Sequence, residues 1–204
     1  MRITMNKKII ILLLCLLFPF KLLYADFKVL SPEEYVGLIA QETLDVLGDK
    51  KSNSDEKIKN ITSIFLSNLA VREISLFVLG PYRRNLTSDQ REEYIKLIKR
   101  FVSEIYSIRL VSFPSGDFSV VGSNDTGRSG IIVKTLIQFL DDPNPTKIDW
   151  RIIKNKNGDF KIFDIRVIGV WMAQEQRSTF TSFLSKNNGN IDKLMDRLRK
   201  QLDG

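Results

Sequence analysis

Residues 159–170 read DFKIFDIRVIGV, and this stretch decides the expected fold. Side chains of a β-strand alternate between its two faces, and here only Asp164 and Arg166 interrupt an apolar pattern. One face would carry Phe163, Ile165 and Val167, and the other would carry Phe160, Ile162 and Ile168. A strand that is apolar on both faces belongs to a sheet that is covered on both faces. The second face either encloses a cavity or packs against further helices, and the pattern leaves both arrangements open.

Three further β-prone segments precede this strand, at about 118–122, 130–140 and 147–155. The turn at 155–158, Asn-Lys-Asn-Gly, is short, and short turns join antiparallel neighbours. We therefore expect a meander of antiparallel strands.

Helical segments flank the strands on both sides in the sequence. Ser31 with Glu34 and Thr87 with Gln90 form capping boxes, which mark helix starts. We expect helices at 32–48, about 56–79, about 88–110, about 171–186 and about 190–202. The second of these carries apolar residues on more than one stripe, so it is either buried on several sides or broken into two pieces. The chain is thus an α+β protein, with helices packed around a mostly antiparallel four- to five-stranded sheet.

The N-terminus has the layout of a secretory signal, with a basic start followed by an apolar run at 9–18. Cleavage after Ala25 would divide the chain into a signal peptide, 1–25, and a domain, 26–204, and would remove Cys15, the single cysteine. It also removes four of the 31 basic residues and none of the 24 acidic ones, so the net charge falls from +7 to +3. That small excess gives little support to nucleic-acid binding.

The sequence contains few side chains that carry catalysis. It has no histidine, and its one cysteine lies in the export signal, which removes most acid/base, thiol and transition-metal chemistry. Asp164 is the one carboxylate with an unusual position, in the middle of a strand. It either pairs with Arg166 or Arg151 or serves as the lone carboxylate of a cone-shaped α+β enzyme. Pairing with an arginine would give Asp164 a role in the fold alone. We expect that the protein is not an enzyme.

Several segments, in order along the chain, resemble one family. The stretch LGPYRRNLTSDQREEY (79–94) is similar to LGxYWRxATPEQRxEF of the MlaC or toluene-tolerance family of periplasmic phospholipid carriers. YSIRL (106–110) resembles the family's YxxRL helix end, and IDWRI (148–152) with GDFKIFDIRVIGV (158–170) resembles its paired strands. QRSTF (176–180) matches its late helix. The chain departs from the family pattern at Arg83, Ile168 and Trp171.

The resemblance implies a soluble periplasmic carrier that holds a glycerophospholipid by its acyl chains and helps to maintain outer-membrane lipid asymmetry. Its implied partners are phospholipid, an inner-membrane MCE-domain ABC transporter complex and an outer-membrane lipoprotein-porin complex. It implies a monomer with bound phospholipid as cargo and with no cofactor, metal or nucleic acid. A carrier of another amphiphile, such as a hopanoid, stays an alternative.

A carrier of this kind needs a lipid-sized hydrophobic cavity enclosed by the sheet and helices. We expect its lining to come from the following pool: Leu79, Phe101, Ile105, Trp150, Ile152, Phe163, Ile165, Val167, Val170, Trp171 and Phe180. Tyr82, Arg83 and Arg109 are the residues expected at the mouth or at a docking surface.

Overall fold

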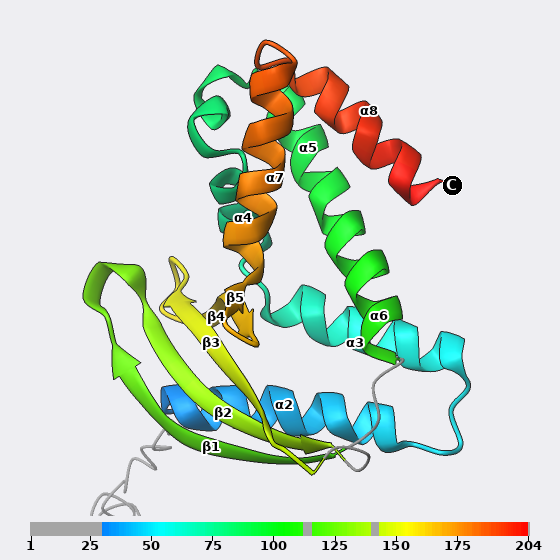
Figure 1. Cartoon of the computed structure of the whole chain (residues 1–204), viewed down its shortest axis with the longest axis vertical. Coiled ribbons are helices and arrows are strands. Elements are labelled where there is room, and N and C mark those ends of the chain that lie inside the picture. The colour runs from blue at the N-terminus through cyan, green and yellow to red at the C-terminus, as the bar shows by residue number, and fades with distance from the viewer. Residues whose placement is uncertain (1–29, 112–115, 140–142, 204) are drawn as a thin grey trace, which may run out of the picture.

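The structure is a computed structural model that describes residues 30–111, 116–139 and 143–203, so the expected signal peptide and Cys15 lie outside the described residues. The helices are α2 (Pro32–Gly48), α3 (Ser54–Asn68), α4 (Val71–Val78), α5 (Ser88–Phe101), α6 (Ser107–Val111), α7 (Met172–Lys186) and α8 (Ile191–Leu202) (Figure 1). The strands are β1 (Gly116–Asp125), β2 (Ile131–Phe139), β3 (Thr146–Lys154), β4 (Phe160–Val167) and β5 (Val170–Trp171). The predicted α+β architecture is confirmed.

The predicted helix starts are confirmed in atomic detail. Ser31 Oγ accepts the backbone N–H of Glu34, and Thr87 Oγ1 accepts that of Gln90, each within a reciprocal capping box. A third capping box, at Asn53, opens α3.

The predicted helical region at 56–79 is broken in two, which is one of the alternatives that its apolar pattern left open. The break lies between α3 and α4, where Leu69 forms a β-bridge with Ile162. The Ala70 N–H donates to the Ile162 carbonyl oxygen at 2.8 Å. Backbone pairing with β4 therefore interrupts the helix and fixes both halves to the sheet.

The helix predicted at 88–110 continues to Val111, but not as one regular α-helix. A π-helical turn, η3 (Val102–Tyr106), separates α5 from α6. Thr62 of α3 donates its hydroxyl to Ser107 Oγ at 3.0 Å beside this turn. A partly buried polar contact therefore holds α3 against the irregular part of the helix.

Within the described residues, the five strands form one antiparallel sheet in the order β1-β2-β3-β4-β5. The last predicted strand is divided by a two-residue turn, Ile168-Gly169, after which Val170 pairs back with Val167. Both turn residues have positive φ, 48° and 84°. This backbone is unusual for a β-branched residue such as Ile168, and the apolar pattern gave no sign of it.

Strand β4 contains a bulge that changes which side chains share a face. Asp164 pairs with Arg151 and Ile162 pairs with Ile152, so Phe163 is the extra residue. The bulge returns Ile165 to the face of Ile162, and Asp164 lies on the opposite face. The prediction that both faces of this strand are largely apolar is therefore wrong, because a strict alternation was assumed across the bulge.

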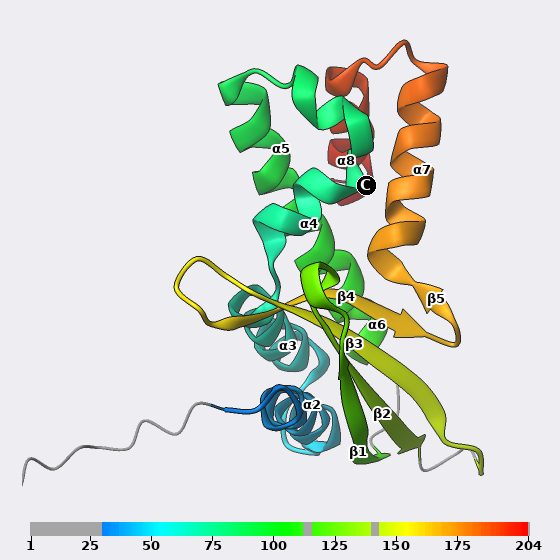
Figure 2. The ribbon, with the colours of Figure 1, turned by 90° about the vertical axis from the view of Figure 1, so that its left-hand side faces the viewer.

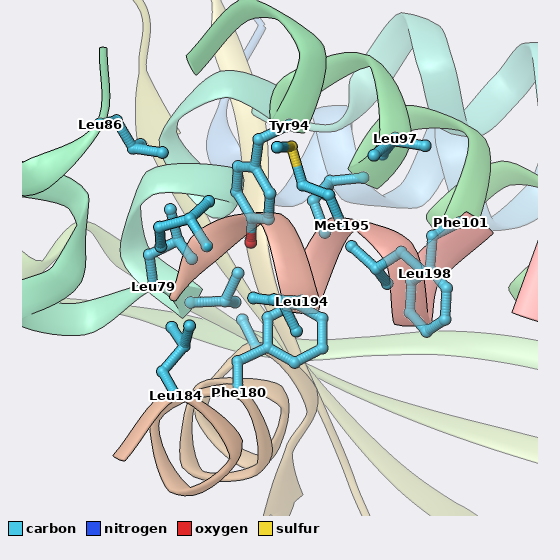
Figure 3. Packing of buried hydrophobic residues seen from close by; sticks show 14 residues of the cluster. Leu79, Leu86, Tyr94, Leu97, Phe101, Phe180, Leu184, Leu194, Met195 and Leu198 are labelled. Carbon is cyan, nitrogen blue, oxygen red and sulfur yellow. The ribbon is translucent and has the colours of Figure 1, made fainter. Parts of the chain in front are cut away.

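The apolar interior consists of two clusters. The helical cluster joins α4, α5, α7 and α8, with buried side chains that include Leu79, Tyr94, Phe101, Phe180, Leu184, Leu194 and Leu198 (Figure 3). The sheet cluster joins α2, α3 and strands β2 to β4 and consists of Val36, Ile39, Ala40, Ile64, Val133, Trp150, Ile152 and Ile162. Figure 2 shows α2 and α3 on one side of the sheet, whereas α4, α5, α7 and α8 gather at one end.

Candidate functional site

Five residues of the predicted lining lie on one face of the sheet: Trp150, Ile152, Ile165, Val167 and Val170, here named the apolar face. Trp150 pairs directly with Ile165, and Val167 pairs directly with Val170. Directly paired residues point to the same side of a sheet, as do residues two apart on a strand. Strand register thus brings together residues from β3, β4 and β5.

Burial falls steadily along the apolar face toward the turn between β4 and β5. Ile152 is fully buried and Trp150 is 9% exposed, whereas Ile165 and Val167 are half-buried and Val170 is 46% exposed. At the turn itself, Ile168 is 82% exposed. The helices thus cover one end of the face well, and its other end lacks an apolar cover within the described residues.

Trp150 has a fixed orientation on this face because its polar atom is bonded. Its indole N–H donates to Thr135 Oγ1 at 3.0 Å, and the Thr135 hydroxyl donates to the Ile148 carbonyl oxygen at 2.7 Å. Ile148 is half-buried and pairs with Val167, so it also belongs on this side of the sheet. The sequence pool left Ile148 out, although its spacing of two from Trp150 would have found it.

Other members of the predicted pool lie in the helical cluster, away from the apolar face. Leu79, Phe101 and Phe180 are buried there, and Figure 3 shows Leu79 and Phe180 on the side toward which the Tyr94 hydroxyl points. Ile105 packs against the same cluster from η3. The structure does not bring these four residues together with the five on the sheet.

Two more pool members lie apart from both groups. Phe163, the bulge residue, meets Phe77 of α4 edge-on at 5.1 Å between ring centroids. Trp171 pairs with Arg166, opposite to the apolar face, and its ring lies under the guanidinium groups of Arg151 at 4.4 Å and Arg166 at 5.0 Å. The Phe163 ring thus lies at the junction with α4, and the Trp171 ring lies among charged groups.

Two hollows open on the surface of the molecule, and neither is lined by a residue of the predicted pool. They have volumes of about 410 and 460 Å3 and lie between α7 and α8. The expected cavity between sheet and helices thus stays a prediction. No helix among the described residues is both long enough and apolar enough to cross a bilayer.

Residues 39–200 match the model of the family described as MlaC protein. The chain belongs to the MlaC family. It is 22% identical over 125 residues to the Haemophilus influenzae intermembrane phospholipid transport system binding protein MlaC, a match that covers 60% of this chain and 58% of that protein. A phospholipid-binding protein from Ralstonia solanacearum, solved in complex with a phospholipid, has the same fold, with a TM-score of 0.68 and 17% identity over 86% of this chain and all of that one.

Two of the segments by which the chain resembles the MlaC family meet in the structure, at Gly80 and Arg177. Gly80 has φ +58°, and a Cβ there would lie 2.8 Å from Thr181 Cγ2 and 3.6 Å from Arg177 Nε. Arg177 in turn lies over the Phe77 ring at 4.8 Å. Glycine is therefore required where η2 (Gly80–Asn85) passes α7.

The residues expected at the mouth lie far from the apolar face of this MlaC-family chain. Tyr82 is half-buried against Gly189 in the turn between α7 and α8, and Arg83 is exposed in η2. This turn and Val170 lie at opposite ends of α7, whose 15 residues span about 22 Å. Arg109 belongs to α6, and its side chain lies outside the described residues.

Asp164 has a structural position at the start of α7. Its Oδ1 accepts the N–H of Ala173 at 2.7 Å and that of Ile165 at 2.9 Å. Burial raises the pKa of this carboxyl, and the bonds from Ala173 and Ile165 and the charge of Arg151 oppose the shift. Among the described residues, no group of three Asp, Glu, His or Cys side chains is placed to hold a metal. Asp164 therefore has the contacts of a helix cap.

Proposed function

We propose that this protein is a periplasmic carrier that binds a glycerophospholipid by its acyl chains and moves it between membrane complexes. The observation that carries the proposal is the apolar face, whose cover ends before the turn between β4 and β5. Membership of the MlaC family supports it, as does the fold shared with a protein solved in complex with a phospholipid. We place the acyl chains along this face, with the headgroup toward solvent.

The free energy of hydrocarbon burial explains why such a site needs few polar groups. Two acyl chains contain about 30 methylenes, and at ~0.8 kcal/mol each their removal from water is worth roughly 24 kcal/mol. One headgroup hydrogen bond contributes only ~1–3 kcal/mol. A bilayer offers the chains a similar environment, so net transfer between membrane and carrier stays near zero and reversible.

The exposed apolar side chains at the turn fit this arrangement. Ile168 and Val170 lie at the uncovered end of the apolar face, next to half-buried Val167 and Ile148. Apolar side chains grouped in this way indicate a surface that another molecule covers. Acyl chains that lie over these side chains would continue the apolar packing of the sheet cluster as far as the turn.

The compartment and partners are part of the same proposal. We infer export with cleavage near Ala25, a monomer in the periplasm without a cofactor, and exchange of lipid with an inner-membrane MCE-domain ABC transporter complex and an outer-membrane lipoprotein-porin complex. An enzyme that uses Asp164 is disfavoured, because Asp164 Oδ1 accepts the Ala173 N–H and so caps the start of α7. A hopanoid carrier would use the same apolar face. The identity of the lipid extracted from the purified protein distinguishes a hopanoid carrier from a phospholipid carrier.

The Val170→Glu variant tests the position of the acyl chains. Val170 is 46% exposed, so the variant should fold, whereas a carboxylate beside hydrocarbon is strongly disfavoured. We expect at least a tenfold loss of co-purified phospholipid, measured by mass spectrometry of the extract.

The matched control is Val121→Glu on β1, where the valine is 62% exposed and outside the apolar face. It should keep its lipid. Equal lipid content in both variants would remove Val170 from the site.

A further inference from the structure

The outer surface between α7 and α8 forms a groove that the proposed lipid site does not use. Its two adjoining hollows, of about 410 and 460 Å3, share Phe183 of α7 and Arg197 of α8. Figure 1 shows the two helices diverging from the turn that joins them. The two hollows therefore form one shallow groove that is open to solvent.

The charges that line this groove are mostly of one sign. Its cations are Lys186 on α7 and Lys193, Arg197 and Lys200 on α8, all of them exposed. The one acid in the lining, Asp196, is already bonded to Arg199 at 2.5 Å. Within the described chain, none of the four cations has an ion-pair partner.

Two of these cations are placed unfavourably for the helix itself. Lys193 and Arg197 are four residues apart, which brings like charges together on one face of α8. Lys193 also lies in the first turn, where the helix dipole disfavours a positive charge, whereas Lys200 lies in the last turn, where the dipole favours one. Helix stability therefore does not account for Lys193 and Arg197, whereas an anionic partner would.

The floor of the groove is aromatic. Phe183 is half-buried, and the Arg197 guanidinium carbon lies 5.1 Å from its ring centroid. Exposed Ser178 and Ser182 of α7 line the same hollow as Phe183. An aromatic ring with arginine, surrounded by polar groups, is the composition of a protein-interaction hot spot.

We propose that the groove between α7 and α8 docks an acidic protein segment that places an apolar side chain on Phe183 and carboxylates beside Lys186, Lys193, Arg197 and Lys200. Two hollows that meet at the Phe183 ring favour a peptide segment, because a peptide can place one apolar side chain on the ring and acidic side chains on either side of it. Attraction between exposed charges speeds the encounter of two proteins and is weakened by salt. Such binding suits a partner that must leave again. The surface lies on helices away from the apolar face, so docking and lipid binding use separate residues.

A labelled peptide tests this proposal on the full chain. The probe is a fluorescein-labelled 12-residue peptide of Glu, Asp and Leu, and the control peptide carries Gln and Asn in place of the acids. We expect fluorescence anisotropy to show binding of the acidic peptide only, with at least a tenfold loss between 50 and 300 mM NaCl. Lys193→Glu with Arg197→Glu should weaken binding at least tenfold.

The matched control reverses two exposed lysines in the loop between α2 and α3, Lys50→Glu with Lys51→Glu, which changes the net charge equally. It should bind the peptide within twofold of the parent protein. If the Lys193 and Arg197 reversal unfolds the chain by circular dichroism, Lys193→Gln with Arg197→Gln replaces it. Phospholipid content, measured in every variant, should stay unchanged, which separates this test from that of the carrier function.

Three results would overturn the proposal. The first is equal peptide binding by the groove variant and the loop control. The second is no binding of the acidic peptide to the parent protein. The third is binding of the parent protein to vesicles with 30% phosphatidylglycerol, lost in the groove variant, without peptide binding, because that result makes the groove a membrane contact.

Discussion

The Tyr94 hydroxyl lies inside the helical cluster, fully buried and without a hydrogen-bond partner among the described residues. Burial raises the pKa of this phenol well above its ordinary value. A buried polar group without a partner keeps its full desolvation cost. Tyr94→Phe should therefore raise the free energy of unfolding by about 1 kcal/mol and Tm by about 2–4 °C, measured by thermal denaturation.

Tyr35 provides the control, because its hydroxyl donates to Asn68 Oδ1 at 3.2 Å. Burial raises the pKa of Tyr35 to about 12. Tyr35→Phe removes a bonded hydroxyl and should lower the free energy of unfolding by about 0.5–1.5 kcal/mol. A loss of stability in Tyr94→Phe as well would show that the Tyr94 hydroxyl has a partner.

Asp164 should make the free energy of unfolding depend on pH in an unusual direction. Because burial raises its pKa, the folded protein binds this proton more tightly than the unfolded chain, whose carboxyl keeps the ordinary value of 3.8. Its contribution to stability is therefore largest below that value and is lost as pH rises through the folded pKa, by at most about 1.4 kcal/mol per pH unit.

Asp164→Asn should remove this part of the pH dependence while its side-chain oxygen still accepts the Ala173 N–H. Urea denaturation of both proteins from pH 3.5 upward checks this. An unchanged difference in stability at every pH would contradict the assignment. The variant should also keep its lipid, whereas an enzyme that used Asp164 would lose turnover.

At the scale of single elements, Gly80 decides how closely η2 approaches α7. Alanine at this position meets a left-handed backbone and Thr181 Cγ2 at 2.8 Å, so Gly80→Ala should cost about 2–4 kcal/mol of unfolding free energy. Gly158→Ala isolates the backbone contribution, because Gly158 has φ +88° and a Cβ added there would meet no atom within 4 Å. It should cost about 1–2 kcal/mol. Equal losses in chemical denaturation would show that Thr181 moves aside.

Local sequence signals predicted the elements well where the cause is local. Capping residues at Ser31 and Thr87 mark helix starts because their hydrogen bonds reach only three residues. The break at Leu69 and the bulge at Phe163 both arise from pairing with distant strand residues. The apolar pattern of 56–79 left a break open as one alternative, but no pattern within one segment could place it at Leu69 or predict the bulge.

At the scale of the whole molecule, the sequence identified apolar residues but could not divide them between two clusters. Trp150 and Phe180 are both large and buried, yet Trp150 belongs to the sheet cluster and Phe180 to the helical cluster. Periodicity predicts that a side chain is buried, but only tertiary packing decides which residues it packs against. The resemblance identified the MlaC family correctly because it covers the chain in order, whereas the individual lining residues depend on strand register.

Native mass spectrometry of the intact protein, purified from the cell envelope without detergent, tests the carrier function most directly. We expect the mature chain with added mass equal to one glycerophospholipid, which collisional activation releases and the extract identifies. A lipid-free mass together with a lipid-free extract would contradict the account, as would a hopanoid in place of the phospholipid.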